Sequence, residues 1–286
     1  MQEELEAIVG DPLIYVESNF EQRFHALDQL EDLLHTFGEA SDTNSLRKRA
    51  ESLKTELEEI DRILFSRLQA NISSGSYTSG EFREMVNTYI SLDLTDNQNQ
   101  EKAGYDELDA FINGLFPDLA LPEQTVALEP EMVYFQKTPA RVVFELIANC
   151  PFAENDVFFD LGSGLGQVSI LVNLLAGVKV NGIELEPAFC TYARSLALSL
   201  NLSELTFIHV DARLADYSAG TVFFLYTPFQ GRMLQEVLDL LQRESLNRKI
   251  KLISYGPCTE YIARQSWLKP ITSGAVDTYK LHIFSS

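Results

Sequence analysis

The sequence predicts an α/β protein in which an all-α N-terminal subdomain precedes a mostly parallel, doubly wound sheet. Over residues 1–115, apolar residues recur at three- and four-residue spacing, as in amphipathic helices. From about residue 131, short β-rich runs alternate with helical runs, which is typical of a parallel sheet covered on both faces. Pro117, Pro122 and Pro130 lie between the two parts in a stretch without a clear period. We therefore expect a helical domain over 1–115, a linker over 116–130 and an α/β domain over 131–286.

The charge of the chain divides at the same place. The whole sequence has a net charge of −20, and residues 1–130 hold 27 Asp and Glu against 9 Lys and Arg, or −18. The remaining residues carry only −2. A segment this acidic repels phosphate backbones, so strong nucleic-acid binding is not expected.

Cysteine usage and hydropathy narrow the class of protein. The 3 cysteines are far apart and no histidines cluster near them, so neither a disulfide framework nor a metal site is expected. The acidic N-terminus does not resemble a signal peptide, and no stretch approaches 18 consecutive apolar residues. We expect a cytoplasmic protein without a membrane partner, and the oligomeric state stays open.

The helical half is expected to contain a hairpin. Apolar stripes over 20–37 and 46–68 predict two long helices that pack against each other, with Gly38 as the expected stop of the first. Shorter helices are expected near 80–91, after Ser79, and near 105–115, with a polar loop over 94–104.

The second half is expected to open with a helix that starts at Thr138-Pro139, a good N-cap and N1 pair, and ends near Asn149. His209 is expected to be a packed histidine rather than a base. The alternating pattern then predicts strands over 157–161, 178–183, 205–210, 221–226 and 249–255, with helices over 166–176, 187–200 and 230–243.

The most informative segment is the glycine-rich turn after the first of these strands. Its spacing is G-x-G-x-G, and Gln167 stands where a dinucleotide fingerprint requires Gly or Ala. Asp160, at the end of the strand, would face a pyrophosphate unfavourably but suits a cationic ligand. S-adenosyl-L-methionine (SAM) carries a sulfonium and an ammonium group and no phosphate, so the turn favours SAM over NAD. The candidate cofactor-binding residues here are Asp160, Gly162, Ser163, Gly164, Gly166 and Gln167.

Two further carboxylates end successive strands. Glu184 follows the second strand, where it can accept hydrogen bonds from ribose hydroxyls, as the acidic residue of dinucleotide folds does. Asp211 follows the third strand, where it can accept a hydrogen bond from the adenine amino group. Glu186 competes with Glu184 for the first role but stands at a helix N-terminus, where an acid also serves the helix.

These motifs give the second half a family resemblance. Residues 131–286 resemble a Rossmann-like class I SAM-dependent methyltransferase, and the run 160–168, Asp-Leu-Gly-Ser-Gly-Leu-Gly-Gln-Val, is similar to that of the histone-lysine methyltransferase family named for disruptor of telomeric silencing. The segments Val133–Thr138 and Gly182–Glu184 fit the family loosely. The resemblance implies a SAM cofactor and adds Thr138 to its expected contacts. Departures at 135–137 and 225–231 from the family's Tyr-Gly-Glu core and paired asparagine put histone methylation in doubt.

The methyl acceptor is expected beside Tyr226, Thr227 and Phe229, since this run follows the fourth strand. It is a small molecule or a protein side chain, and no metal is implied. A rival hypothesis is a catalytically inactive SAM-binding regulator or scaffold whose helical half binds a partner, and a second is an NAD-type oxidoreductase. We also expect the last helices of the first half and residues 116–137 to pack near the mouth of the ligand site.

Overall fold

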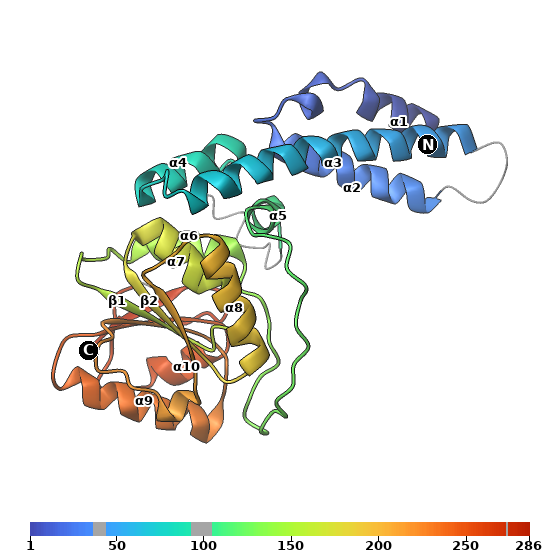
Figure 1. Cartoon of the computed structure of the whole chain (residues 1–286). Helices are drawn as coiled ribbons and strands as arrows, with labels where there is room; N and C mark the ends of the chain where they lie inside the picture. Colours follow the sequence, from blue (N-terminus) through green and yellow to red (C-terminus); the bar gives the residue numbers. More distant parts are fainter. Residues whose placement is uncertain (37–43, 93–104, 273) are drawn as a thin grey trace.

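A computed structural model of the chain describes residues 1–36, 44–92, 105–272 and 274–286. Within these residues the chain forms a seven-stranded sheet with helices on both faces, preceded by a helical part (Figure 1). The predicted fold class is confirmed. No helix of the described residues is long and apolar enough to cross a membrane. The expected stop at Gly38 and the expected loop over 94–104 lie outside the described residues.

The strands follow the order β3-β2-β1-β4-β5-β7-β6 across the sheet. The first five are parallel, and β7 runs antiparallel to both of its neighbours, which the alternating pattern did not predict. At the β3 edge His209 is exposed, so the expectation of a packed histidine is wrong. The strands are β1 Val157–Leu161, β2 Lys179–Glu184, β3 Leu205–His209, β4 Val222–Tyr226, β5 Lys251–Tyr255, β6 Lys269–Pro270 and β7 His282–Ser285.

Helices cover both faces of the sheet (Figure 1), and the sheet lies between two hydrophobic clusters. Side chains alternate along each strand, so Phe158 packs on the face of α6 (Ala140–Asn149), α7 (Gln167–Ala176) and α8 (Pro187–Ser199). Phe159 packs on the opposite face with α9 (Gly231–Ser245) and α10 (Cys258–Ala263). A short 3₁₀ turn, η4 (Ala212–Leu214), follows β3.

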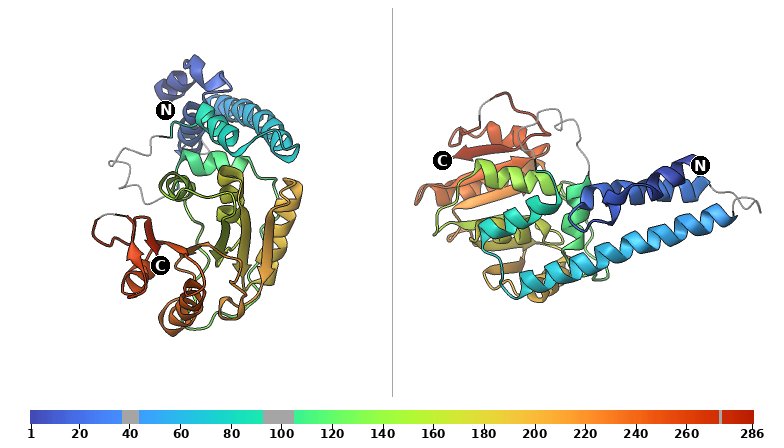
Figure 2. Two further views of the ribbon diagram at one scale, coloured as in Figure 1. Left: turned by 90° about the vertical axis from the view of Figure 1, so that its left-hand side faces the viewer. Right: turned by 90° about the horizontal axis from the view of Figure 1, so that it is seen from above.

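The helical half contains the predicted hairpin, α2 (Phe20–Thr36) and α3 (Asn44–Ser73), which projects from the α/β part (Figure 2). Two shorter helices follow, α4 (Ser79–Tyr89) and α5 (Glu107–Gly114). Thr78, rather than Ser79, caps α4 in a capping box with Glu81. The segments α1 (Gln2–Val9) and η1 (Pro12–Tyr15) were not predicted, and they pack on the distal part of the hairpin.

The helical half shares a core with the sheet. One cluster of buried residues runs from Leu64 of α3 and Phe111 of α5 to Phe224 of β4. The carboxylate of Asp109, in α5, accepts a hydrogen bond from the backbone N–H of Ala140 (2.8 Å) and so caps α6. The expectation that Thr138 caps this helix is therefore wrong, because Pro139 occupies the cap position and Asp109 supplies the acceptor. The division at 115 and 131 stays a prediction.

Candidate ligand-binding site

The glycine turn between β1 and α7 lies at the edge of the sheet that the carboxyl ends of the strands form. Gly162, Gly164 and Gly166 have φ values of +80°, +53° and +88°, a region that L residues rarely adopt. A Cβ at Gly162 would lie 2.4 Å from Pro228 Cβ, and one at Gly164 would lie 2.2 Å from the Phe135 ring. The turn thus needs glycine both for its backbone angles and for the close approach of neighbouring segments.

Asp160 lies buried at the end of β1, with 3% of its surface exposed. Its Oδ2 accepts a hydrogen bond from the Ser169 hydroxyl (2.8 Å). Burial raises the pKa of Asp160 to about 7, and the nearby charge of Glu184 adds to the effect. A cation beside this carboxyl would favour its ionised form.

Glu184, at the end of β2, holds the glycine turn in place. Its two carboxylate oxygens accept hydrogen bonds from the backbone N–H groups of Gly164 and Glu186, both at 2.8 Å. Burial raises the pKa of Glu184 against the lowering effect of these hydrogen bonds. Each carboxylate oxygen has a second lone pair, so Glu184 keeps the capacity to accept hydrogen bonds from a ligand.

Glu186 has a different role from Glu184. It caps α8 through the backbone N–H of Ala188 and accepts hydrogen bonds from the N–H groups of Thr125 and Val126 and from the Thr125 hydroxyl. Burial acts to raise its pKa, but these hydrogen bonds outweigh burial and lower the pKa to about 2. Glu186 is therefore an anchor for residues 125 and 126, as well as the helix acid that the sequence suggested.

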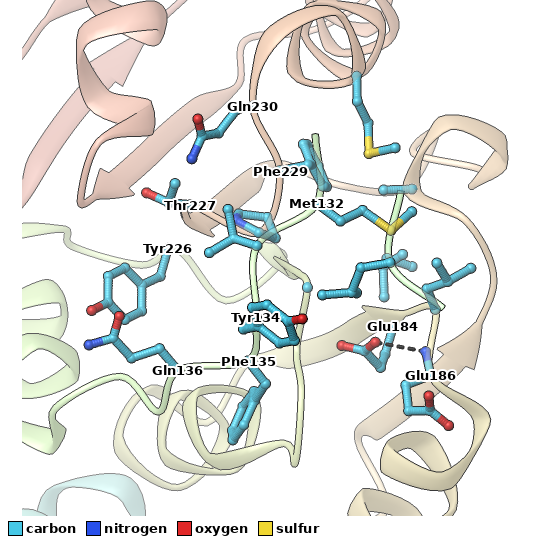
Figure 3. Close-up of a pocket in the computed structure, with 18 of the residues that line it drawn as sticks. Met132, Tyr134, Phe135, Gln136, Glu184, Glu186, Tyr226, Thr227, Phe229 and Gln230 are labelled. Atoms are coloured by element: carbon cyan, nitrogen blue, oxygen red, sulfur yellow. Dashed lines mark hydrogen bonds between the residues drawn. The ribbon is translucent and has the colours of Figure 1, made fainter. Parts of the chain in front are cut away.

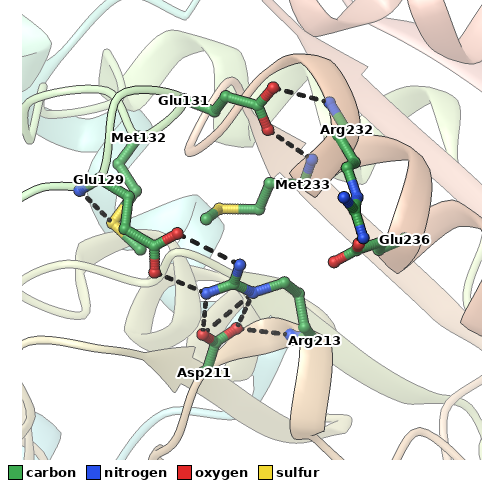
Figure 4. A network of polar contacts seen from close by, with 8 residues as sticks. All are labelled: Glu129, Glu131, Met132, Asp211, Arg213, Arg232, Met233 and Glu236. Atoms are coloured by element: carbon green, nitrogen blue, oxygen red, sulfur yellow. Dashed lines mark hydrogen bonds and ion pairs between the residues drawn. The ribbon is translucent and has the colours of Figure 1, made fainter.

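Asp211 forms an ion pair instead of presenting a free carboxylate (Figure 4). The Arg213 guanidinium donates to both of its oxygens, at 2.5 Å from Nη2 and 3.0 Å from Nε, and lowers the pKa of Asp211. The same guanidinium donates to Glu129 (2.7 Å). Arg213 therefore joins the predicted adenine-side acid to the segment before residue 131, which no local pattern indicated.

Two cavities lie along this edge. The first, of about 350 Å³, is lined by Glu184, Asp211 and the segment after β4 (Figure 3). The second, of about 730 Å³, is lined by Asp160, Ser163 and Gln167, and on its other side by Asn113 and residues 116–119. Gly162, Phe135, Gln136 and Tyr226 line both cavities. The expectation that the end of the helical half and residues 116–137 pack near the mouth of the site is confirmed.

Five of the predicted cofactor residues line the second cavity: Thr138, Asp160, Gly162, Ser163 and Gln167. The Gln167 side-chain amide donates to the backbone carbonyl of Thr138 (3.0 Å). Gln167 Oε1 and Ser163 Oγ are buried and have no hydrogen-bond partner among the described residues. Such orphan polar atoms are costly unless something satisfies them, so they indicate a polar partner in this cavity.

The three residues predicted on the acceptor side, Tyr226, Thr227 and Phe229, all line the first cavity, and the last two also make contacts within the fold. Thr227 has φ +41°, and its hydroxyl donates to the Tyr255 carbonyl (3.4 Å) and accepts from the Cys258 N–H (3.1 Å). Phe229 is buried in the α9 cluster. Burial raises the pKa of Tyr226 to about 12, so its phenol stays protonated at neutral pH.

Residues 124–136, which we call the strap, form one wall of the first cavity (Figure 3). Met132 makes an isolated β-bridge with Phe229, and the Val133 N–H donates to the Pro228 carbonyl (3.1 Å). The carboxylate of Glu131 accepts hydrogen bonds from the N–H groups of Arg232 and Met233, at 3.1 and 2.7 Å, and so caps α9 (Figure 4). These partners are about a hundred residues apart in the chain, so no short motif could have revealed them.

Part of the chain is similar to a known protein family. Residues 130–221, less than half of the chain, match the model of a family described as "Histone methylation protein DOT1", which confirms the resemblance that the sequence suggested. No curated protein matches the chain.

Solved structures of methyltransferases are also similar to the chain. One is an RNA methyltransferase from Salinibacter ruber in complex with S-adenosyl-L-homocysteine, with 23% identity over 52% of this chain and 92% of that one and a TM-score of 0.42. Another is precorrin-6y C5,15-methyltransferase from Geobacter metallireducens, with 17% identity, 54% and 91% coverage and a TM-score of 0.41. A third is magnesium protoporphyrin IX methyltransferase from Synechocystis with bound SAM, with 15% identity, 51% and 76% coverage and a TM-score of 0.36.

Proposed function

We propose that the chain is a SAM-dependent methyltransferase that acts on a small molecule or a protein side chain. The observation that carries the proposal is the succession along one sheet edge of the glycine turn after β1, Glu184 after β2 and Asp211 after β3. In doubly wound sheets, ligands bind outside the carboxyl ends of the strands. A carboxylate-lined edge favours a cationic ligand over a pyrophosphate.

The described residues fit SAM. Glu184 would accept hydrogen bonds from the ribose hydroxyls, and Asp211, held by Arg213, would lie on the adenine side. Asp160, Ser163, Gln167 and Thr138 line the second cavity and would hold the amino-acid end, where the two orphan oxygens would find partners. When bound, SAM supplies a methyl group on a positively charged sulfur.

The remaining contribution of the chain is positioning. Methyl transfer is an in-line displacement, and holding the two reactants in the right geometry supplies much of the rate. The strap and the turn after β4 are joined by the hydrogen bond between Val133 and Pro228, and together they would exclude water from the first cavity. Tyr226, as a neutral phenol, would orient the acceptor by donating or accepting a hydrogen bond.

The test is calorimetry of the full chain with SAM, S-adenosylhomocysteine and NAD. We expect the first two to bind and NAD not to bind. Gly164→Ala should weaken SAM binding at least about tenfold, because the new Cβ would displace the ring of Phe135, which lines both cavities.

Gly75→Ala is the matched control. Gly75 has φ +69°, and a Cβ added there would have no atom within 4 Å. This variant therefore carries the cost of a left-handed alanine without a steric contact, and it should bind SAM like the parent. Binding of NAD in preference to SAM would overturn the proposal. SAM binding without S-adenosylhomocysteine formation in the presence of lysate-derived acceptors would favour the inactive regulator.

A further inference from the structure

The order of the strands in the sheet indicates at which end of the first cavity the methyl acceptor would lie. If the nucleoside lies over β2 and β3, beside Glu184 and Asp211, and the glycine turn lies at β1, the next strands along the edge are β4 and β5. Tyr226 ends β4 and Tyr255 ends β5, and both side chains line the first cavity. The acceptor side of the site is therefore this end of the cavity.

The walls at this end are aromatic and neutral. The rings of Tyr226 and Tyr255 lie with centroids 5.1 Å apart. Tyr279 and Tyr134 line the same cavity and are 69% and 79% exposed, so their rings stand at its rim. Gln136 and Gln230 add side-chain amides from the strap and from the residue before α9 (Figure 3).

The acids that line the cavity are engaged elsewhere. Glu184 and Glu186 hold backbone N–H groups, and Asp211 pairs with Arg213, all at the β2 and β3 end. Burial raises the pKa of both Tyr226 and Tyr255. Glu145, Asp277 and Tyr105 lie close enough to influence these phenols, but they are not among the lining residues. The described lining residues of the β4–β5 end thus offer flat rings and neutral hydrogen-bonding groups.

We propose that the acceptor is a neutral, planar nitrogen heteroaromatic molecule of the pyridine type, bound against the rings of Tyr226, Tyr255 and Tyr279. This proposal rests on the proposed function. A pyridine-type nitrogen has a free in-plane lone pair at neutral pH, whereas an ammonium or a phenol must first lose a proton. The rings stack on a flat acceptor, and the amides pair with its polar substituents.

The transfer balances without a base. The nitrogen lone pair forms the new N–CH₃ bond as the C–S bond breaks, and the electron pair of that bond stays on sulfur, which becomes a neutral thioether. The positive charge moves from sulfur to the ring nitrogen, and no proton is transferred. Tyrosine faces attract the resulting ring cation.

The test uses the full chain with SAM and four probes: quinoline, nicotinamide, benzylamine and phenol. We expect N-methylated quinoline or nicotinamide, detected by mass spectrometry together with S-adenosylhomocysteine, at a rate that, with SAM at saturating concentration, is flat with pH around neutrality. Tyr279→Leu should lower kcat/KM for the heteroaromatic probe about tenfold, and Tyr279→Phe should retain it, because the ring is what contributes. Tyr261→Leu, an exposed tyrosine that does not line the cavity, is the control and should match the parent.

Calorimetry of each variant with SAM separates the two proposals. A chain that binds SAM but methylates neither heteroaromatic probe overturns the acceptor assignment alone. Faster methylation of benzylamine or phenol, with a rate that rises with pH, does the same, and so does a Tyr279→Leu variant as active as the parent. A chain that does not bind SAM overturns the proposed function and this inference with it.

Discussion

At the scale of single residues, Asp160 is the group whose ionisation best reports what the site holds. It is buried at the end of β1, its hydroxyl partner is Ser169, and its pKa of about 7 places its titration near neutral pH. A cationic ligand would bind more tightly to the ionised form. Ligand affinity and proton release at Asp160 are therefore linked.

We predict that SAM binding weakens as pH falls below about 7, by up to about tenfold per pH unit, because protonation removes the Asp160 charge. Isothermal titration calorimetry from pH 8 to pH 6 measures this. Asp160→Asn should bind SAM more weakly at pH 8 and lose the pH dependence. An unchanged slope in Asp160→Asn would show that another group titrates.

The same residue affects stability with a definite sign. The pKa of Asp160 in the folded chain lies above the ordinary aspartate value of 3.8, so the folded chain binds this proton more tightly than the unfolded chain. The contribution of Asp160 to folding is therefore favourable below about pH 4 and is lost as pH rises towards about 7. Asp160→Asn should accordingly unfold at a temperature no lower than the parent at pH 8.

Residues that local pattern can specify were predicted well. The glycines at 162, 164 and 166 follow from the sharp turn between a buried strand and a helix, and Glu184 follows from the strand end. Thr138 failed as a helix cap because Asp109, about thirty residues earlier in the chain, competes for the same N–H group. Sequence spacing cannot show a competitor that only the tertiary fold brings near.

At the scale of elements, the strap is held by partners from three separate parts of the sheet domain. Glu186 at the start of α8 holds residues 125 and 126, Arg213 in η4 holds Glu129, and the N-terminus of α9 holds Glu131. Each contact pairs a carboxylate with cationic or N–H donors, and charge-assisted hydrogen bonds are stronger than neutral ones. The strap is thus a fixed wall of the first cavity without belonging to a helix or strand.

Glu186→Gln should loosen the strap, because an amide presents one acceptor oxygen where the carboxylate presents two. We expect a loss of about 1.5–3 kcal/mol in unfolding free energy, since hydrogen bonds to charged groups contribute about that much, and faster proteolysis within residues 122–131. Denaturant unfolding and limited proteolysis measure these effects. The exposed Glu123→Gln, in the same stretch, is the control.

The pH dependence of this anchor is opposite to that of Asp160. The pKa of Glu186 is lowered from 4.5 to about 2, so its contribution is present at neutral pH and is lost as pH falls from about 4.5 to about 2. The difference in stability between parent and Glu186→Gln should shrink over that range. A constant difference would mean that the carboxylate charge does not hold the strap.

Strand and helix positions were predicted closely wherever apolar periodicity was strong, as at β1, which matches over Val157–Leu161. The failures have physical causes. The two-residue β6 is too short to show a period, and β7 is recognisable as antiparallel only from its pairing with β5. The helix α1 begins with acidic residues and has only two buried apolar residues, Leu5 and Ile8, which are too few to show a helical period.

At the scale of the whole molecule, the buried apolar side chains of the helical half belong to two separate clusters. Its proximal part, including Leu64, belongs to the core that reaches the sheet. Its distal part, including Leu30, forms a separate cluster with α1 and η1. The sequence predicted a helical part before an α/β part and a charge of −18 over residues 1–130. It could not show that the cores of the two parts are continuous, since that depends on which helix faces meet.

Leu64→Ala and Leu30→Ala test this division. Both leucines are fully buried, so each change should cost about 2–5 kcal/mol locally. We expect Leu64→Ala to lower the melting temperature reported by the fluorescence of Trp267, the single tryptophan, which packs in the α9 and α10 cluster. Leu30→Ala should mainly lower the helical signal in circular dichroism. Equal effects of the two variants on Trp267 would contradict a separate distal cluster.

The position of β7 has a consequence for how the molecule folds. This strand, His282–Ser285, follows all the others in the sequence yet lies between β5 and β6. Until it docks, β5 presents an open edge and β6 has no neighbour in the sheet. Unpaired strand edges promote association with other chains. Slow docking of residues 282–285 would thus leave a nascent molecule with the glycine turn and strands β1 to β5 already formed and the free edge of β5 open to aggregation, so we expect refolding yield to depend on chain concentration.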